Sequence, residues 1–383
     1  MATHARPGSL PSQSPAGRRV PELDPALVAQ WQTGGGELID LFAQARERLG
    51  GVAAFRLGPS PAVPTVLVTD PQAVQHVLAL HPGRYVKRSH RARVLIGDGV
   101  LAATGEAWQR QRRLLQSQFT GRGMRRYEQR ITEAARTTAA RWAGYARTGE
   151  VFDVGDEMRR FALDTIWRSL TGHRLDPGTE RELASVQAVV AALPSLPADG
   201  VAAQGAVAAE LARIDAVASH AIAAARDGEA GPDGPGLLHV LLEAAGTRPE
   251  YTDRLIRDEL VTLLVAGATE DDILAGYEVE AGTDVLVCPY LTHRDPGLWE
   301  DPGRFDPGRF TTPGRRPAHP GSYLPFGIGP RACLGLQFAL RESTVLLEHL
   351  LPAHTPRFRS TPAKAAYSIT VRPDGPTPAT LGP

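Results

Sequence analysis

The chain has 383 residues, of which 42% are hydrophobic and 22% are charged, and its 42 basic and 42 acidic side chains cancel. This length and composition can bury a large core, as one big domain or two ordinary ones. Because there is no net positive charge, we expect no nucleic-acid partner. The only cysteines, Cys288 and Cys333, are too few for a disulfide framework, which favours a cytoplasmic protein. We expect no transmembrane segment, since no apolar run approaches roughly 20 residues.

The first third of the chain begins with a segment rich in proline and arginine, and residues 1–24 are predicted to form a disordered tail. Residues 52–57 and 65–69 have the composition of two strands, joined by a Gly-Pro-Ser-Pro turn. Asp70 and Pro71 then predict a helix start, because aspartate caps a helix and proline suits its first position. Residues 25–383 are predicted to form a single domain.

Helical periodicity dominates the middle of the chain, mainly over residues 106–225. A glycine-rich loop is predicted at 227–236, and a further helix at 252–270. From residue 276 onward, Asp-Pro and Gly-containing turns replace this pattern. The predicted fold class is therefore mainly α with a small mixed β-sheet, an α+β arrangement.

The most informative segment covers residues 326–335, which read Phe-Gly-Ile-Gly-Pro-Arg-Ala-Cys-Leu-Gly. Its glycines and proline disfavour both helix and strand, whereas helical spacing resumes directly after Cys333. Cys333 is thus predicted to lie where a rigid turn meets a helix N-terminus. The amides there favour an anionic sulfur and lower a thiol pKa from its usual value of about 8.5. Arg331 can pair with a carboxylate.

The segment has two other interpretations. An isolated cysteine in a cytoplasmic protein is ordinarily a buried free thiol. Residues 327–332 also fit the dinucleotide-binding pattern Gly-x-Gly-x-x-Ala, which requires a preceding strand and an acidic residue some twenty positions later. Pro320, Pro325 and Pro330 surround the match, so we reject the dinucleotide interpretation.

The segment resembles the cysteine-loop signature of the cytochrome P-450 family, Phe-x-x-Gly-x-Arg-x-Cys-x-Gly. All five fixed positions match, at Phe326, Gly329, Arg331, Cys333 and Gly335. The resemblance implies a P-450 fold and haem b, with Cys333 as the axial ligand of the haem iron. It also implies that Arg331 holds a haem propionate, that Phe326 packs near the porphyrin and that Gly335 completes the loop.

A second part of the resemblance is Trp108-x-x-x-Arg112, whose two side chains share one face of a predicted helix. In the P-450 family this pair meets the haem propionates, and a planar guanidinium suits a carboxylate. Alone, the pattern is ordinarily a packed tryptophan beside a surface arginine. Its context, Gly-Glu-Ala before Trp108 and Arg-Leu after Arg112, favours the haem-binding interpretation.

The segment that should activate oxygen departs from the family. Residues 266–270, Ala-Gly-Ala-Thr-Glu, resemble the start of the family pattern, and Thr269 and Glu270 are the candidate catalytic residues. Asp271 follows, so the usual order of acid then threonine is not restored. Residues 271–279 already resemble a later β-hairpin. An internal deletion near 270–271 would account for this: the second half of the oxygen helix, the following two helices and their Glu-x-x-Arg motif are missing.

Such a deletion predicts three structural consequences. The helix at 252–270 would span only about 28 Å at 1.5 Å per residue. Arg309 would lose the partners that the family gives it, and an unpaired buried charge costs roughly 3–5 kcal/mol. A missing strand would leave the strands at 65–69 and 284–289 with unpaired edges.

The sequence leaves several functions open. The first is a haem-thiolate monooxygenase that inserts one oxygen atom into an apolar small molecule. Its electrons would come from NAD(P)H through a ferredoxin-type partner, and residues 94–101, 189–196 and 264–268 would line the substrate pocket. The second is a catalytically inactive, internally deleted remnant of such an enzyme. The deletion would lie either in the gene itself or only in the gene model from which the sequence was translated. A haem-binding protein without turnover and a non-haem protein with a structural Cys333 are the remaining alternatives.

Overall fold

The computed structural model describes residues 18–57, 64–85, 90–193, 196–197, 199–263, 273–274, 277–279, 283–359, 365–367 and 371–382. Two compact units are distinguished within the chain. The described residues of Met1–Val86 and Ala268–Ala332 belong to the first unit, and those of Lys87–Gly267 and Cys333–Pro383 to the second. The chain passes between the units directly before Cys333.

A three-stranded mixed sheet organises the first unit. Its order is β2 (Val52–Arg56), β3 (Pro64–Val68) and β7 (Asp284–Val287). β2 and β3 are antiparallel, as the hairpin-like sequence predicts, whereas β7 runs parallel to β3 and pairs Thr65 with Asp284. The prediction of two unpaired edges is therefore wrong. β7 occupies the place beside β3 and satisfies its backbone groups directly.

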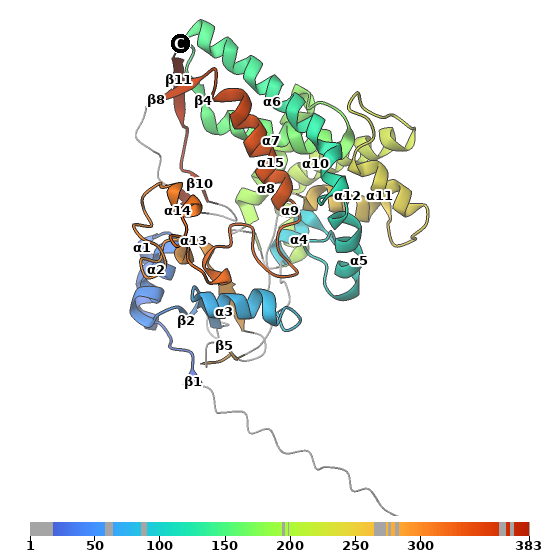
Figure 1. Cartoon of the computed structure of the whole chain (residues 1–383). Helices are drawn as coiled ribbons and strands as arrows, with labels where there is room; N and C mark the ends of the chain where they lie inside the picture. Colours follow the sequence, from blue (N-terminus) through green and yellow to red (C-terminus); the bar gives the residue numbers. More distant parts are fainter. Residues whose placement is uncertain are drawn as a thin grey trace, which may run out of the picture. The chain divides into compact units, whose positions relative to one another are not determined.

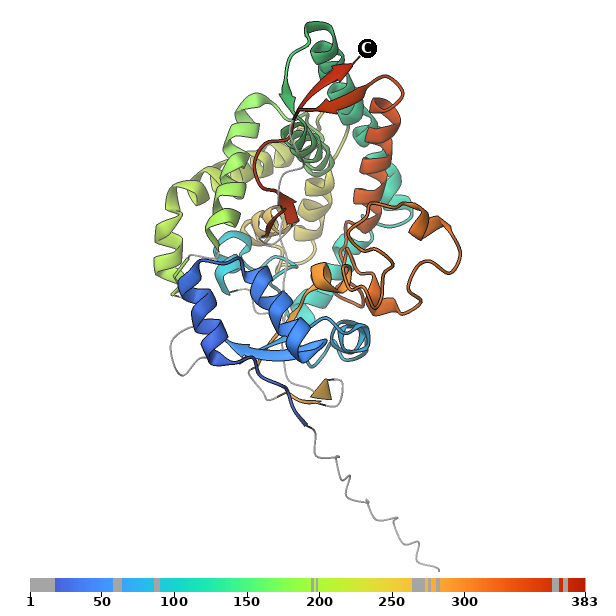
Figure 2. The same cartoon turned by 90° about the vertical axis from the view of Figure 1, so that its left-hand side faces the viewer.

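Two helices cover this sheet, α1 (Pro25–Gly34) and α2 (Leu38–Leu49), drawn in dark blue beside the strands in Figure 2. Phe55 of β2 and Leu41 of α2 are fully buried in the same apolar cluster. The hydrophobic effect therefore holds the helices against the sheet.

After β3, the chain enters α3 (Pro71–Gln75), which continues as the π-helical turn η1 (His76–Leu80). The predicted cap is confirmed, because the Asp70 side chain accepts a hydrogen bond from the backbone N–H of Ala73 at 2.9 Å.

The N-terminal segment is ordered earlier than the sequence predicts. Arg18–Arg19 forms β1, which pairs in parallel with β6 (Tyr277–Glu278), and β6 pairs antiparallel with β5 (Ile273–Leu274). Leu23 is only 2% exposed. The predicted disordered tail at 1–24 is thus too long at its C-terminal end, because the apolar Leu23 is buried beside the sheet.

The turn-rich segment of the first unit contains three short helices, α13 (Pro289–Thr292), α14 (Gly308–Thr311) and η3 (Pro320–Ser322). Arg309 of α14 is buried, and its guanidinium donates to the backbone carbonyls of Glu300, Asp301 and Arg304 at 2.9, 3.2 and 2.9 Å. The prediction that Arg309 is left without partners is therefore wrong. Backbone carbonyls of its own loop replace the expected carboxylate.

His293 also has a structural role in this segment. Burial lowers the pKa of His293 to about 4, with Arg294 adding to the effect. The neutral ring accepts a hydrogen bond at Nε2 from the backbone N–H of Leu324 at 2.9 Å.

The second unit is mainly helical (Figure 1). Its helices are α4 (His90–Ile96), α5 (Gly105–Gln116), α6 (Arg122–Thr148), α7 (Val154–Thr171), α8 (Pro177–Ala192), α9 (Gly200–Ala206), α10 (Ala208–Arg226), α11 (Leu237–Ala245), α12 (Asp253–Thr262) and α15 (Leu336–Leu350). Its strands form the sheet β4–β11–β8 and the antiparallel pair β9–β10: β4 (Phe152–Asp153), β8 (Thr355–Phe358), β9 (Ala365–Tyr367), β10 (Val371–Pro373) and β11 (Pro378–Gly382). The predicted class, mainly α with a small mixed sheet, is confirmed.

The long helix α6 packs along α15, the helix that follows Cys333. Tyr127 of α6 meets Phe338 of α15 edge to face, with ring centroids 5.5 Å apart. Phe119 completes this aromatic group, which lies in the largest apolar cluster of the unit. Burial of these rings fixes the axis of α15 and, with it, the position of its N-terminus.

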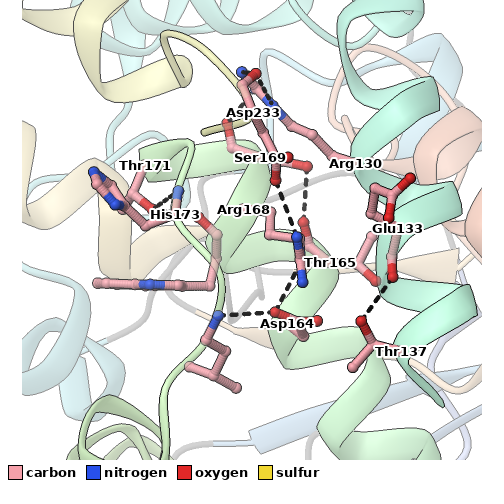
Figure 3. Close-up of polar contacts among 12 residues, drawn as sticks. Arg130, Glu133, Thr137, Asp164, Thr165, Arg168, Ser169, Thr171, His173 and Asp233 are labelled. Carbon is pink, nitrogen blue, oxygen red and sulfur yellow. Dashed lines mark hydrogen bonds and ion pairs between the residues drawn. The ribbon is translucent and has the colours of Figure 1, made fainter. Parts of the chain in front are cut away.

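A buried charge network joins α6 and α7 to the glycine-rich loop predicted at 227–236 (Figure 3). The Arg168 guanidinium binds Asp164 at 3.0 Å and Asp233 at 3.1 Å, while Arg130 donates to the Asp233 carbonyl at 2.9 Å. Both arginines, and the carboxylates of Asp164 and Asp233, thereby have charged or hydrogen-bonded partners, as buried charges require.

The helix predicted at 252–270 begins where expected. The Thr252 hydroxyl accepts from the backbone N–H of Leu255 at 3.2 Å, and α12 extends from Asp253 to Thr262. Residues 264–272 lie outside the described residues. Thr269, Glu270 and the inferred deletion junction at 270–271 are among them.

Candidate haem-binding site

The cysteine loop forms two tight turns before it leaves the first unit. Gly327 and Gly329 have φ angles of 70° and 74°, in the left-handed region that favours glycine. The backbone N–H of Ala332 donates to the Gly329 carbonyl at 3.0 Å. The predicted rigid, non-helical turn is present.

Gly329 has a second reason to lack a side chain. A Cβ there would lie 2.0 Å from the backbone oxygen of Leu78 and 2.8 Å from the Cα of Ala79. The cysteine loop therefore packs directly against the backbone of η1. This contact fixes the position of the loop within the first unit.

Cys333 is exposed, three residues before α15 begins at Leu336. Gly335 occupies the cap position, and its carbonyl accepts from the N–H of Ala339 at 2.8 Å. A Cβ at Gly335 would lie 3.9 Å from the Cys333 Sγ, so glycine leaves the space beside the sulfur open. The prediction that Cys333 lies between a turn and a helix N-terminus is confirmed.

Trp108 and Arg112 lie one turn apart on α5, and both side chains are half-buried. Burial lowers the pKa of the Arg112 guanidinium, and the Cys333 sulfur opposes this effect electrostatically. Arg112 and Cys333 are therefore near one another within the second unit. Trp108 packs against the apolar cluster that Leu334 also contacts.

The chemistry of these groups fits haem. A thiol at a helix terminus can ligate iron as the thiolate, and a half-buried guanidinium with an adjacent indole can bind carboxylates. Phe326 and Arg331, also half-buried, belong to the first unit.

Sequence reasoning missed Asp258 and Glu259 of α12, which are 2% and 0% exposed. Both accept hydrogen bonds from the backbone of the segment before α5. A signal was present in the sequence, because Glu259 shares a helix face with the apolar residues Ile256 and Leu263. An acid on an apolar face indicates a buried, specific partner.

Comparison with known proteins decides the family. The family model Cytochrome P-450 matches residues 20–199 and 254–364, well over half of the chain. The chain belongs to the cytochrome P-450 family. Among curated P-450 proteins, cytochrome P-450 4V2 of Rattus norvegicus is 37% identical over 107 residues, which is 27% of this chain and 20% of that protein. The chain thus spans between a fifth and about a quarter of the length of the curated relatives it matches.

Solved structures of P-450 proteins share the fold. The haem domain of cytochrome P-450DA superimposes with a TM-score of 0.78 at 23% identity, covering 96% of this chain and 98% of that one. A cytochrome P-450 named CYP102L1 gives a TM-score of 0.79 at 19% identity, covering 96% and 99%. Within the described part of this P-450, no helix has the length and apolar character needed to cross a membrane.

Proposed function

We propose that this P-450 is a haem-thiolate monooxygenase that inserts one oxygen atom from dioxygen into an apolar small molecule. The observation that carries the proposal is the exposed Cys333 thiol before α15, with the half-buried Arg112 near enough for the two groups to interact electrostatically. Haem b, when bound, supplies the redox chemistry that splits dioxygen and oxygenates the substrate.

The residues of the chain have separate roles in this proposal. Cys333 binds the iron through its thiolate, which the amides at the start of α15 stabilise. Arg112 and Trp108 hold the propionates from α5. Arg331 is assigned to a propionate, Phe326 to the porphyrin and Gly335 to the loop because their positions match the family motif.

The apolar substrate is inferred from one cluster of the second unit. Val94, Leu95 and Ile96 pack in the same buried cluster as Val189 and Leu196. These residues come from two of the segments that the sequence assigns to the pocket. A cluster of aliphatic side chains favours an uncharged, apolar ligand.

We further propose that electrons come from NAD(P)H through a ferredoxin-type partner in the cytoplasm. Thr269 and Glu270 are the proposed proton-relay residues. The competing proposal is an internally deleted P-450 that still binds haem without turnover, and Asp271 directly after Glu270 favours it, because a threonine is expected there.

The first experiment is the absorption spectrum of the reduced, carbon monoxide-bound chain after haem supplementation. We expect the red-shifted Soret band of thiolate-ligated haem in the wild type and its loss in Cys333→Ser. Cys288→Ser is the matched control, because Cys288 is buried in the first unit and burial raises the pKa of its thiol. A wild type without haem uptake would overturn the proposal.

A second experiment separates the two candidates. Reduced ferredoxin, regenerated by a ferredoxin reductase and NADPH, is supplied with a panel of apolar compounds. Product formation that requires Cys333 supports the monooxygenase. A thiolate–haem band with no product and no consumption of NADPH above the background without the chain supports the remnant.

A further inference from the structure

The helix α15 is apolar on two opposite sides, of which only one lies in the core. On the inner side, Phe338 packs against Tyr127 of α6. On the outer side, three leucines are exposed to 52, 49 and 59%, namely Leu340, Leu347 and Leu351. A single exposed leucine is ordinary, whereas exposed leucines that share one side of a helix form a patch of the kind that marks an interaction surface.

These leucines repeat with the spacing of a helix–helix seam. Together with one exposed threonine they form the outer stripe of α15: Leu340, Thr344, Leu347 and Leu351. Intervals of four, three and four residues place all members along one side of the helix. Leu351 is the C-cap residue, and its φ of −65° and ψ of −32° keep it on the helical path. The Thr344 hydroxyl donates to the Leu340 carbonyl at 2.8 Å, so its proton needs no partner on a facing helix.

Two opposite charges flank the outer stripe on the same side. Arg341 and Glu348 each directly follow a leucine of the stripe and are seven residues apart. Glu348 is exposed. The Arg341 Nε donates to the Glu128 Oε1 of α6 at 2.7 Å, yet 39% of the arginine side chain remains exposed. Arg341 is therefore held beside the stripe and still open to a second carboxylate.

A second copy of α15 in the antiparallel direction covers the outer stripe completely. In that register Leu340 of one copy meets Leu351 of the other, and Thr344 meets Leu347. A two-fold axis relates the two helices, so each of these contacts occurs twice. Every leucine of the stripe is then removed from water, which favours association.

The same register brings the flanking charges together. In an antiparallel helix pair, residues that flank the seam on the same side of each helix face one another, so Arg341 of each copy lies beside Glu348 of the other. A parallel pair in register would instead place Arg341 beside Leu336 and gain no charged contact. The outer stripe is therefore complementary to itself in the antiparallel direction.

We propose that the outer stripe of α15 is the surface through which two copies of this chain associate, as an antiparallel helix pair with two-fold symmetry. The leucines supply the apolar contact, and the two Arg341–Glu348 contacts set the direction and register. The contact is confined to the 15 residues of α15 in each copy. Such a small interface corresponds to a weak dimer, with a dissociation constant in the micromolar range.

Sedimentation of the full chain over a range of concentrations tests the proposal. We expect the wild type to shift from monomer to dimer, whereas the triple variant Leu340→Ser, Leu347→Ser, Leu351→Ser stays monomeric. Val201→Ser is the matched control, because Val201 is 79% exposed but lies on α9, and its dimerisation should equal that of the wild type. A wild type that remains monomeric, or a triple variant that still dimerises, would overturn the proposal.

Charge reversal tests the antiparallel register. Glu348→Arg and Arg341→Glu each place like charges together in a homodimer, so each should weaken dimerisation by about tenfold. An equimolar mixture of the two variants restores both opposite-charge contacts and should associate about as strongly as the wild type. The pair of Arg341 with Glu128 is exposed, so its loss should leave the melting temperature near that of the wild type. A mixture as weak as its separate components would refute the antiparallel pair.

An electron-donating protein is the other possible occupant of this face, and binding of oxidised ferredoxin distinguishes it. Isothermal titration should give the same dissociation constant for the wild type and the triple serine variant. A monomeric wild type that binds ferredoxin, together with a triple variant that does not, would assign the outer stripe to the electron donor and overturn the proposal. Sedimentation does not require haem, so a chain that fails to bind haem refutes the proposed function and leaves this test intact.

Discussion

The Glu259 Oε2 accepts the Val100 amide at 2.9 Å, while its Oε1 has no hydrogen-bond partner among the residues that the structure describes. This half-satisfied carboxyl is fully buried. Burial raises the pKa of Glu259 from 4.5 to about 8, the Val100 hydrogen bond opposes this, and Asp258 adds to it. Glu259 is therefore a neutral acid at pH 7. Glu342 of α15 is only partly buried, and burial raises its pKa to about 8 as well.

The free energy of unfolding should fall as pH rises from about 5 to 8. Between its unfolded and folded pKa values, such an acid holds its proton in the folded state and releases it on unfolding. Each pH unit in this window therefore lowers the free energy of unfolding by at most about 1.4 kcal/mol per acid. Below pH 4.5 the penalty is absent, and above about 8 it is complete.

Urea titrations at each pH measure this slope. Between about pH 6.5 and 8, Glu259→Gln should remove roughly half of it, because Glu342 supplies the rest; below pH 6.5 the buried His293, with its pKa lowered to about 4, adds a slope of opposite sign. Glu348→Gln, which changes an exposed acid of α15, should leave the profile unaltered. An identical slope in wild type and Glu259→Gln would contradict the assignment.

Arg112→Gln should release haem about tenfold faster than the wild type. A hydrogen bond to a charged group contributes about 1.5–3 kcal/mol, and the proposed guanidinium–propionate contact is of that kind. Haem transfer to excess apomyoglobin measures the rate. Arg113→Gln is the control, since Arg113 follows directly on α5 but is exposed. Equal rates for the two variants would remove Arg112 from the haem site.

Arg309→Gln should lower the free energy of unfolding by about 2–3 kcal/mol. The substitution withdraws the donors that satisfy three backbone carbonyls around a buried side chain. Chemical denaturation checks the loss. Arg304→Gln changes an exposed neighbour in the same loop and should cost little. Similar losses for both would mean that the carbonyls find water instead.

Arg168→Met should destabilise the second unit by about 3–5 kcal/mol. It leaves the carboxylates of Asp164 and Asp233 buried without their cation. The control is Arg159→Met on the same helix, which breaks an exposed pair with Asp156 and should cost no more than about 1 kcal/mol. Thermal unfolding monitored by circular dichroism distinguishes the two. A small effect at Arg168 would mean that the network is hydrated.

Interactions between residues close together in the sequence determine several caps, strands and turns of this protein. The cap at Asp70, the strands around the first turn, the helix start at Thr252 and the turn before Cys333 depend on neighbouring residues, so the sequence predicted each of them. The five-position cysteine motif likewise indicated the family that the comparisons establish.

Only the tertiary structure decided which distant groups meet. Sequence reasoning left β3 with a free edge and Arg309 without partners, yet β7 pairs with β3 and loop carbonyls bind Arg309. It also gave no role to Glu259, because the acceptor and the Val100 amide are 159 residues apart. Spacing along a chain encodes contacts within one helix or turn. Contacts across a core depend on how separate elements pack, and that packing is set by burial of the whole set of apolar faces.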